Sequence, residues 1–369
     1  MTARSPHEAH RAATPLELFF DLVFVVAIAQ AASSLHHAVS AAHVAHGLAG
    51  YLMVFFAIWW AWINFTWFAS AYDCDDVPYR LMVFVQMTGA LIIAAGVPAM
   101  FEGHGSTTVT LGYVVMRSAV VAQWLRAASA DPLRRKTAHR YAIGISTLQV
   151  AWLGLLFLPD VWLAGFLILV VFEVLVPVWA ERAAPTPWHP HHIAERYGLL
   201  TLIVLGESIL AAMIAVQAAL AGGERLAALA PTIVGGLLVV CAMWWIYFDR
   251  PVHDLLTNFR KVFMWGYGHY AVFASAAAVG AGLAVNVDYV TGHSKVSAVV
   301  AGYAVAIPAA VYLGCLWLLH DRPEYRRTRA FGPVTALLIL LSPFTGQGVL
   351  MTGLVLAALV ASKLVVKAG

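Results

Sequence analysis

The chain contains repeated apolar stretches long enough to cross a lipid bilayer, and these constrain its fold more than any other feature. A membrane-spanning helix needs about 20 predominantly apolar residues. Backbone groups in lipid must be hydrogen-bonded within the chain, so we expect these stretches to be helices. They number twelve, at approximately 15–36, 46–70, 81–101, 108–127, 138–158, 160–180, 195–220, 226–248, 261–285, 294–319, 330–345 and 347–367. The sequence therefore predicts an all-α polytopic membrane protein with about 12 transmembrane helices.

The composition excludes several classes of protein. Hydrophobic residues make up 62% of the 369 residues and charged residues only 11%, whereas soluble domains carry about 25% charged residues. A soluble enzyme, a disordered regulator and a nucleic-acid binder are therefore excluded. Three widely spaced cysteines exclude a disulfide framework and a cysteine-ligated zinc site. The sequence has no P-loop and no nucleophile-elbow or dinucleotide-binding motif, so we predict no catalytic residues and no cofactor.

The basic residues indicate how the helices are oriented. With twelve spans, all but three of the 22 Lys and Arg residues fall on the side that holds both termini. By the positive-inside rule that side is the cytoplasm, which predicts a multi-pass protein of the bacterial inner membrane. The predicted organisation is a cytoplasmic tail at 1–14, a six-helix half at 15–182, a Pro- and His-rich cytoplasmic linker at 183–194, and a second six-helix half at 195–369. The linker histidines lack helical spacing and acidic co-ligands, so we predict no metal site.

The two halves share landmarks at nearly constant offsets. The run that begins at Asp21 is matched by the run that begins at Glu207, and Trp59-Trp60 is matched by Trp244-Trp245. Gly112-Tyr113 is matched in the same order by Gly302-Tyr303. Six spans per half predict parallel repeats, a plan found in transporters whose functional path lies between the repeats.

Two segments resemble the signatures of a known family. Thr14-Pro-Leu-Glu-Leu-Phe-Phe-Asp-Leu-Val-Phe-Val25 is similar to the first signature of the bacterial low temperature requirement protein A family. Glu195-Arg-Tyr-Gly-Leu-Leu-Thr201 with Val204-Leu-Gly-Glu-Ser208 is similar to the second. The resemblance covers essentially the whole chain. It implies a polytopic inner-membrane protein linked by name to growth in the cold, and it implies no settled biochemical activity.

Charged residues inside a bilayer cost roughly 2.5–3.5 kcal/mol each on insertion scales, so each is a candidate functional residue. Glu17 has an alternative role, because Thr14, Pro15 and Glu17 form a capping box at the start of the first helix. Asp21 lies one turn further along the same face, roughly 10 Å into the helix, where capping does not explain it. It is predicted to be a proton or cation site, with a structural ion pair as the alternative.

Glu207 is the repeat partner of Asp21 and is followed by small residues that allow close helix contact. Two such carboxylates near one axis would suit proton exchange, and an interhelical hydrogen bond is the alternative. Arg117, in the fourth span, is a candidate counter-ion or gating residue for Asp21, Glu173 or Glu207. Glu173, in the sixth span, is a further ion-binding candidate.

The remaining candidates lie at span ends and in aromatic pairs. Glu195 and Arg196 suggest a local cytoplasmic cap or ion pair. Trp60 and Trp245 either line a pathway or serve as packing and interface anchors.

These residues favour a secondary transporter or ion-conducting protein that uses Asp21 and Glu207 for protons or cations. Two alternatives stay open: a membrane scaffold or stress sensor that transports nothing, and an intramembrane enzyme that modifies lipid. The expected partners are the lipid bilayer and a small ion or molecule of unknown identity. We expect no nucleic acid, and a homo-oligomer stays open.

Overall fold

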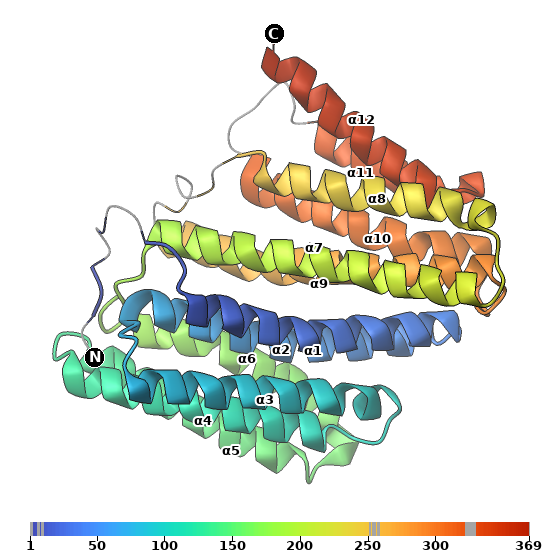
Figure 1. Cartoon of the computed structure of the whole chain (residues 1–369). Helices are drawn as coiled ribbons and strands as arrows, with labels where there is room; N and C mark the ends of the chain where they lie inside the picture. Colours follow the sequence, from blue (N-terminus) through green and yellow to red (C-terminus); the bar gives the residue numbers. More distant parts are fainter. Residues whose placement is uncertain are drawn as a thin grey trace. The chain divides into compact units, whose positions relative to one another are not determined.

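The computed structural model describes residues 3–5, 8, 11–250, 252, 256, 259–321 and 330–368. Throughout these residues the secondary structure is helical, and no strand occurs (Figure 1). The α-helices are α1 (Pro15–Ser40), α2 (Val44–Tyr72), α3 (Val77–Phe101), α4 (Thr107–Ala130), α5 (Arg135–Leu155), α6 (Trp162–Glu181), α7 (Pro190–Ala221), α8 (Leu226–Phe248), α9 (Phe259–Val290), α10 (Ala298–Leu316), α11 (Phe331–Leu341) and α12 (Gly348–Ala368).

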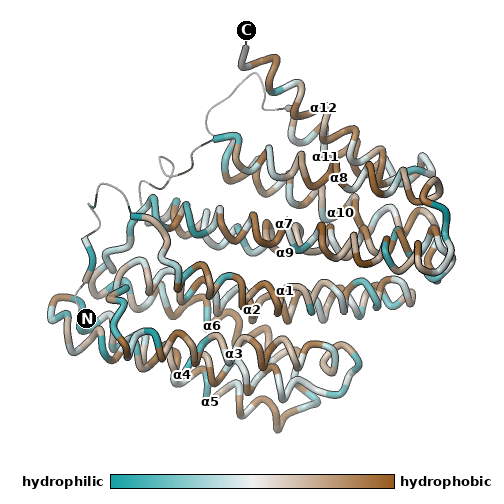
Figure 2. The backbone as a smooth tube through the Cα atoms, in the orientation of Figure 1, coloured by the Kyte–Doolittle hydropathy of each residue, from teal (hydrophilic) through white to brown (hydrophobic). Residues whose placement is uncertain are grey.

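Each of the twelve apolar stretches of the sequence coincides with one of these helices. Within the described part of the chain, nine helices are long and apolar enough to cross a membrane. The helices α4, α5 and α11 do not meet this criterion, because α4 and α5 carry several charged or polar residues and α11 has only 11 residues. Hydrophobic residues fill the middle of the helices and hydrophilic residues gather at the turns (Figure 2). The chain is a multi-pass membrane protein.

The helix α7 begins earlier than the sequence suggests. The predicted span starts at residue 195, but the helix starts at Pro190. Proline is favoured in the first turn of a helix, where its missing N–H has no partner to lose. His191 and His192 therefore lie in the first turn of a helix, and His189 directly precedes it.

The helices form two compact units. The first comprises Met1–Gln30 and Phe56–Tyr197, and the second comprises Ala31–Phe55 and Gly198–Gly369. In the first unit α3 packs on α4, α4 on α5 and α5 on α6. In the second unit α9 packs on α10, α10 on α11, α11 on α12, and α12 on α8.

Glycine permits the closest of these helix contacts. A Cβ atom on Gly89 of α3 would lie 2.6 Å from the carbonyl oxygen of Gly112 of α4, and a Cβ on Gly112 would lie 2.7 Å from that of Gly89. In the second unit a Cβ on Gly353 of α12 would lie 2.6 Å from the carbonyl oxygen of Gly235 of α8. These backbones approach too closely for any side chain, as is common between membrane helices.

Candidate functional site

The candidate site begins at the first turn of α1. The backbone N–H of Thr14 donates to Glu17 Oε2 at 2.8 Å, and that of Glu17 donates to Thr14 Oγ1 at 3.3 Å. The capping box predicted from the sequence is thus present. It engages one oxygen of the Glu17 carboxylate and leaves the other, Oε1, facing α7.

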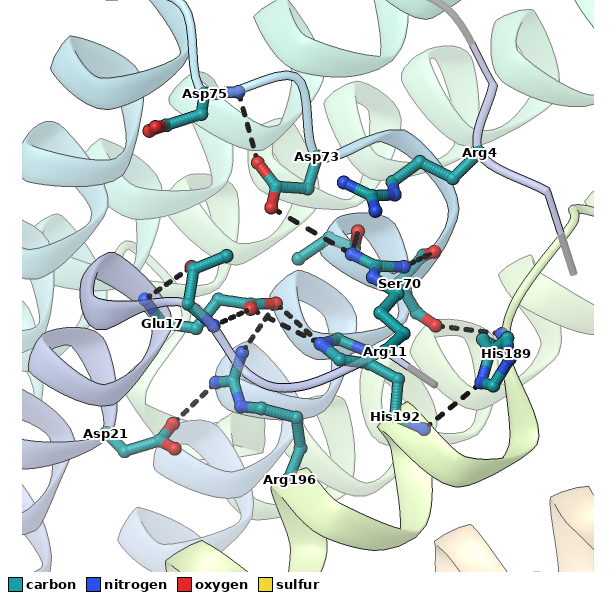
Figure 3. A network of polar contacts seen from close by, with 12 residues as sticks. Arg4, Arg11, Glu17, Asp21, Ser70, Asp73, Asp75, His189, His192 and Arg196 are labelled. Carbon is teal, nitrogen blue, oxygen red and sulfur yellow. Dashed lines mark hydrogen bonds and ion pairs between the residues drawn. The ribbon is translucent and has the colours of Figure 1, made fainter. Parts of the chain in front are cut away.

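Two pairs of side chains spaced four residues apart face each other at the centre of the site. Glu17 and Asp21 project from α1, and His192 and Arg196 project from α7 (Figure 3). Residues at i and i+4 share one face of a helix, so the two ionisable side chains of each pair lie next to each other on the same face. All four side chains are fully buried within the first unit.

Arg196 bridges both carboxylates. Its Nη1 lies 3.0 Å from Glu17 Oε1, and its Nη2 donates to Asp21 Oδ1 at 2.6 Å. The indole N–H of Trp62 donates to the same Asp21 oxygen at 2.7 Å. His192 Nε2 lies 3.1 Å from Glu17 Oε1. The guanidinium of Arg196 therefore contacts both carboxylates, and the imidazole of His192 contacts that of Glu17 as well.

A second layer of polar groups lies at the ends of α1, α2 and α7. Arg11 donates to the backbone carbonyls of Ser70 and Ala69, and its Nη2 lies 3.9 Å from Asp73 Oδ2. Burial lowers the pKa of the Arg11 guanidinium, while burial and then the nearby Glu17 raise the pKa of the Asp73 carboxyl. Arg11 and Asp73 therefore add one potential charge of each sign beside the four central groups.

Other groups tie this layer to the centre. The backbone N–H of His189 donates to Ser70 Oγ at 3.0 Å, and that of His192 donates to His189 Nδ1 at 3.4 Å (Figure 3). The hydroxyl of Tyr79 on α3 is buried near the same charges. The site thus draws groups from the N-terminal segment and from α1, α2, α3 and α7.

The charges of the four central groups do not balance while the imidazole is neutral. Glu17 and Asp21 carry two negative charges, and Arg196 carries one positive charge. One added proton, on His192 or on a carboxylate, makes the group neutral. Asp21 Oδ2, Arg196 Nε and His192 Nδ1 are buried and have no hydrogen-bond partner among the described residues. Buried polar groups are normally paired, so these unpaired atoms distinguish the cluster from a fully satisfied ion-pair network.

Glu173 of α6 lies in a different kind of environment. Oε2 accepts from Trp60 Nε1 and from Arg117 Nη2, both at 2.8 Å. Oε1 accepts from the Tyr113 hydroxyl at 3.0 Å and from Trp152 Nε1 at 3.1 Å. Four buried donors thus surround this carboxylate, an arrangement expected of a structural anchor between α2, α4, α5 and α6.

Comparisons with known proteins identify the family. Residues 12–368 match the family described as bacterial low temperature requirement A protein (LtrA). The chain belongs to the LtrA family. It is 28% identical over 284 residues to an uncharacterized protein of Rhizobium meliloti (strain 1021), a match that covers 69% of this chain and 65% of the relative. The chain thus matches slightly less than two thirds of that relative's length. No solved structure matches the chain significantly.

The site joins the two segments on which the LtrA resemblance rests. Glu17 and Asp21 come from the segment at 14–25, and Arg196 comes from the segment at 195–208. The sequence predicts a local cytoplasmic cap or ion pair for Glu195 and Arg196, whereas the partners of Arg196 lie about 175 residues away. The spacing of His192 and Arg196, which repeats that of Glu17 and Asp21, is the signal that could have identified this pairing.

The other residues singled out from the sequence are dispersed. Glu207 belongs to the second unit, is half-buried, and forms no hydrogen bond or ion pair within the described part of the chain. Glu195 is half-buried. Trp245 is 41% exposed and packs edge-on against Trp244, with ring centroids 6.2 Å apart. Arg117 takes Glu173 as its partner, one of three that the sequence left open.

The histidines form no evident metal centre. The described residues contain no group of three or more His, Cys, Asp or Glu side chains placed to hold a metal ion. Two of the linker histidines have other partners. His192 Nε2 lies 3.1 Å from Glu17 Oε1, and His189 Nε2 lies 2.8 Å from the backbone carbonyl oxygen of Glu8.

Proposed function

We propose that the protein moves protons or small cations across the membrane and that Glu17, Asp21, His192 and Arg196 form its exchange site. The observation that carries this proposal is a fully buried cluster of two acids around one guanidinium and one imidazole. Such a cluster gains neutrality by binding one positive charge. Burying charge in a membrane protein is costly, and the cost is tolerated where the charge has a task.

Proton exchange at this cluster needs no large rearrangement. When a proton arrives, His192 or an adjacent carboxylate takes it, and the attraction that holds Arg196 between the acids weakens. When the proton leaves, Arg196 again bridges Glu17 and Asp21. Two carboxylates competing for one guanidinium have coupled proton affinities, so the group titrates as a unit. Asp73, with its raised pKa, is the neighbouring group from which a proton would enter.

The partner of the acids is Arg196 rather than Arg117. The sequence predicts Arg117 as a counter-ion or gating residue for Asp21, Glu173 or Glu207, and Arg117 lies 2.8 Å from Glu173 in the four-donor anchor. The tuning role therefore passes to Arg196, and we retain Asp21 as the central acid.

We propose Glu207 as a second ion-binding carboxylate. It is the sequence counterpart of Asp21. Glu207 is half-buried and has no ion-pair partner among the residues that the structure describes, whereas Asp21 pairs with Arg196. The contacts between consecutive helices from α3 to α6, and again from α9 to α12, are compatible with a duplicated plan of two parallel six-helix repeats, with all twelve helices crossing the membrane. On the same basis, and from the distribution of Lys and Arg, we place both termini in the cytoplasm of a bacterium and the chain in its inner membrane.

A scaffold or stress sensor that transports nothing is the second candidate, favoured by the Glu173 anchor. A carboxylate that accepts from four donors stabilises helix packing and has no role in transporting an ion. If the Glu17–Asp21–Arg196 cluster is also only an anchor, its neutral variants would alter folding and nothing else. The low temperature requirement that the family description names would then follow the amount of folded protein.

The test is ion flux in liposomes that contain the full-length protein. A pH-sensitive dye inside the liposomes reports proton entry when a potassium gradient with valinomycin imposes a membrane potential. Parallel runs impose a Na⁺ or K⁺ gradient as the driving force instead and test for flux of that cation. We expect flux in the native protein and its loss in Asp21→Asn combined with Glu207→Gln. The absence of flux under every gradient, or equal flux in the double variant, would exclude the proposal.

A further inference from the structure

The second unit contains a long apolar groove that the proposed exchange site does not use. It runs along α9 between Tyr270 and Val285, and its other walls come from the end of α1, the start of α2, and α10. The fifteen residues between these two positions correspond to about 22 Å at 1.5 Å per helical residue. This length exceeds half of the hydrocarbon core, which is about 30 Å thick, so the groove could hold a lipid chain from one leaflet.

Small side chains on α9 create the hollow. Ala271, Ala274, Ala278 and Ala281 follow one another at helical spacing along the groove, and positions three or four apart share a helix face. Ala271 and Ala278 are only half-buried. The opposing wall carries larger side chains, among them Leu48 of α2.

The groove is apolar even where its residues carry hydroxyl groups. The Tyr51 hydroxyl donates to the backbone carbonyl of Ala274 at 2.6 Å, and the Tyr270 hydroxyl donates to that of Leu52 at 2.8 Å. The Ser275 hydroxyl donates to the carbonyl of Ala271 at 2.6 Å. These groups are already paired, so they require nothing from a bound molecule and present carbon to the groove.

Only one end of the groove reaches polar groups. Val39 and Val285 line the groove. Ser40 directly follows Val39, and Asp288 lies about one turn beyond Val285. The side chains of Ser40 and Asp288 form a hydrogen bond of 2.7 Å. His36 Nε2 lies 2.7 Å from the same Asp288 oxygen. The backbone N–H of Lys295 donates to the carbonyl of Ser40 at 2.8 Å, and the Lys295 side chain is exposed. The opposite end, near Tyr270, lies well inside α9.

We propose that this groove binds one acyl chain of a membrane phospholipid, with the headgroup phosphate at the Ser40–Lys295 corner. The groove has the asymmetry of such a lipid: a chain-length apolar wall, and polar groups together with the exposed Lys295 side chain at one end only. The walls belong to membrane-spanning helices, so acyl chains are the surrounding solvent. Binding the chain in the groove covers Ala271 and Ala278, the two groove alanines that are only half-buried.

The experiment uses a phosphatidylglycerol that carries a diazirine in its acyl chain, added to the full-length protein in nanodiscs. After illumination, mass spectrometry identifies the labelled peptides. We expect labelling of α9 between residues 270 and 285 and loss of that labelling in Ala278→Phe, which fills the groove. Ala358→Phe places the same ring on an exposed position of α12 and is the matched control, in which α9 labelling persists.

Competition identifies the source of the chain. Unlabelled phosphatidylglycerol should remove the α9 labelling, and free palmitate at the same chain concentration should not. Ala271→Phe provides a second groove variant in case Ala278→Phe fails to fold. Unchanged α9 labelling in a folded groove variant, displacement by palmitate alone, or a dimer that Ala278→Phe dissociates would each overturn the proposal. None of these readouts depends on ion flux.

Discussion

At the residue scale, Arg196 decides the character of the site. It is fully buried and contacts one oxygen of Glu17 and one of Asp21, at 3.0 and 2.6 Å. A guanidinium presents several donors in a fixed plane, whereas an ammonium is a compact point charge. An arginine can therefore hold two separate carboxylates at once, and a lysine at this position cannot reproduce both contacts.

The first prediction concerns the loss of this guanidinium. Arg196→Gln leaves two buried carboxylates without their counter-charge, and breaking a buried pair costs about 3–5 kcal/mol of unfolding free energy. We expect a lower thermal midpoint in detergent, followed by tryptophan fluorescence. Adding Asp21→Asn to Arg196→Gln removes one unpaired charge and should restore part of the stability. A double variant whose loss equals the sum of the two single losses would contradict the ion-pair geometry.

The second prediction separates the Glu173 anchor from the exchange site. Glu173→Gln turns an amide N–H₂ toward groups that donate and leaves Arg117 unpaired, which again costs about 3–5 kcal/mol. Proton flux per folded molecule should stay at the native level, because this carboxylate carries no exchanging proton. Glu195→Gln is the matched control: it makes the same chemical change at a half-buried position, where effects usually stay within about 0.5 kcal/mol.

At the scale of elements, local sequence signals specify the helices. The capping residues at the helix ends make contributions to folding stability that can be measured. Asp76 caps α3: its side chain accepts from the backbone N–H of Tyr79 at 2.8 Å and also pairs with Arg126 at 2.6 Å. The hydrogen bond from Arg126 lowers the pKa of the Asp76 carboxyl below its usual value of 3.8.

The third prediction is the pH dependence of this cap. Because the folded pKa is lowered, the contribution of Asp76 to stability is present above about pH 4 and is lost as the pH falls through the folded pKa. We expect Asp76→Asn, which keeps a capping oxygen but not the charge, to remove this acid-dependent part of the stability. Asp76→Ala should cost about 1 kcal/mol more, through loss of the cap. Thermal unfolding between pH 3 and pH 7 measures both effects.

The fourth prediction tests the contact between α3 and α4. Gly112→Leu places a side chain where a Cβ alone would lie 2.7 Å from the Gly89 carbonyl oxygen, so the two helices must separate. We expect severe loss of stability or of folding yield. Gly154→Ala on α5 meets no atom within 4 Å and should be neutral or stabilising by up to about 1 kcal/mol. Tolerance of Gly112→Leu would contradict the packing described for these helices.

At the scale of the whole molecule, sequence predicted the helices better than it predicted their contacts. Hydropathy, turn residues and prolines located twelve helices, and the capping box located the start of α1. The start of α7 was missed because a Pro- and His-rich segment has the composition of a loop, although Pro190 is acceptable in a first helical turn. The contact of Glu17 and Asp21 with Arg196 depends on how helices far apart in the chain pack. The shared four-residue spacing makes each pair a candidate partner for the other, but it does not specify that the two helices meet.

The fifth prediction tests the central claim most directly, and it compares proton flux in two variants that each neutralise one buried carboxylate. Asp21→Asn and Glu173→Gln are reconstituted separately in liposomes at equal amounts of folded protein, with the native chain as reference. Asp21→Asn should abolish the proton flux that a membrane potential drives, because the exchange site loses its central acid, and Glu173→Gln should retain it. Equal flux in the two variants, whether both retain it or both lose it, would contradict the assignment of the exchange site to the Glu17–Asp21–His192–Arg196 cluster.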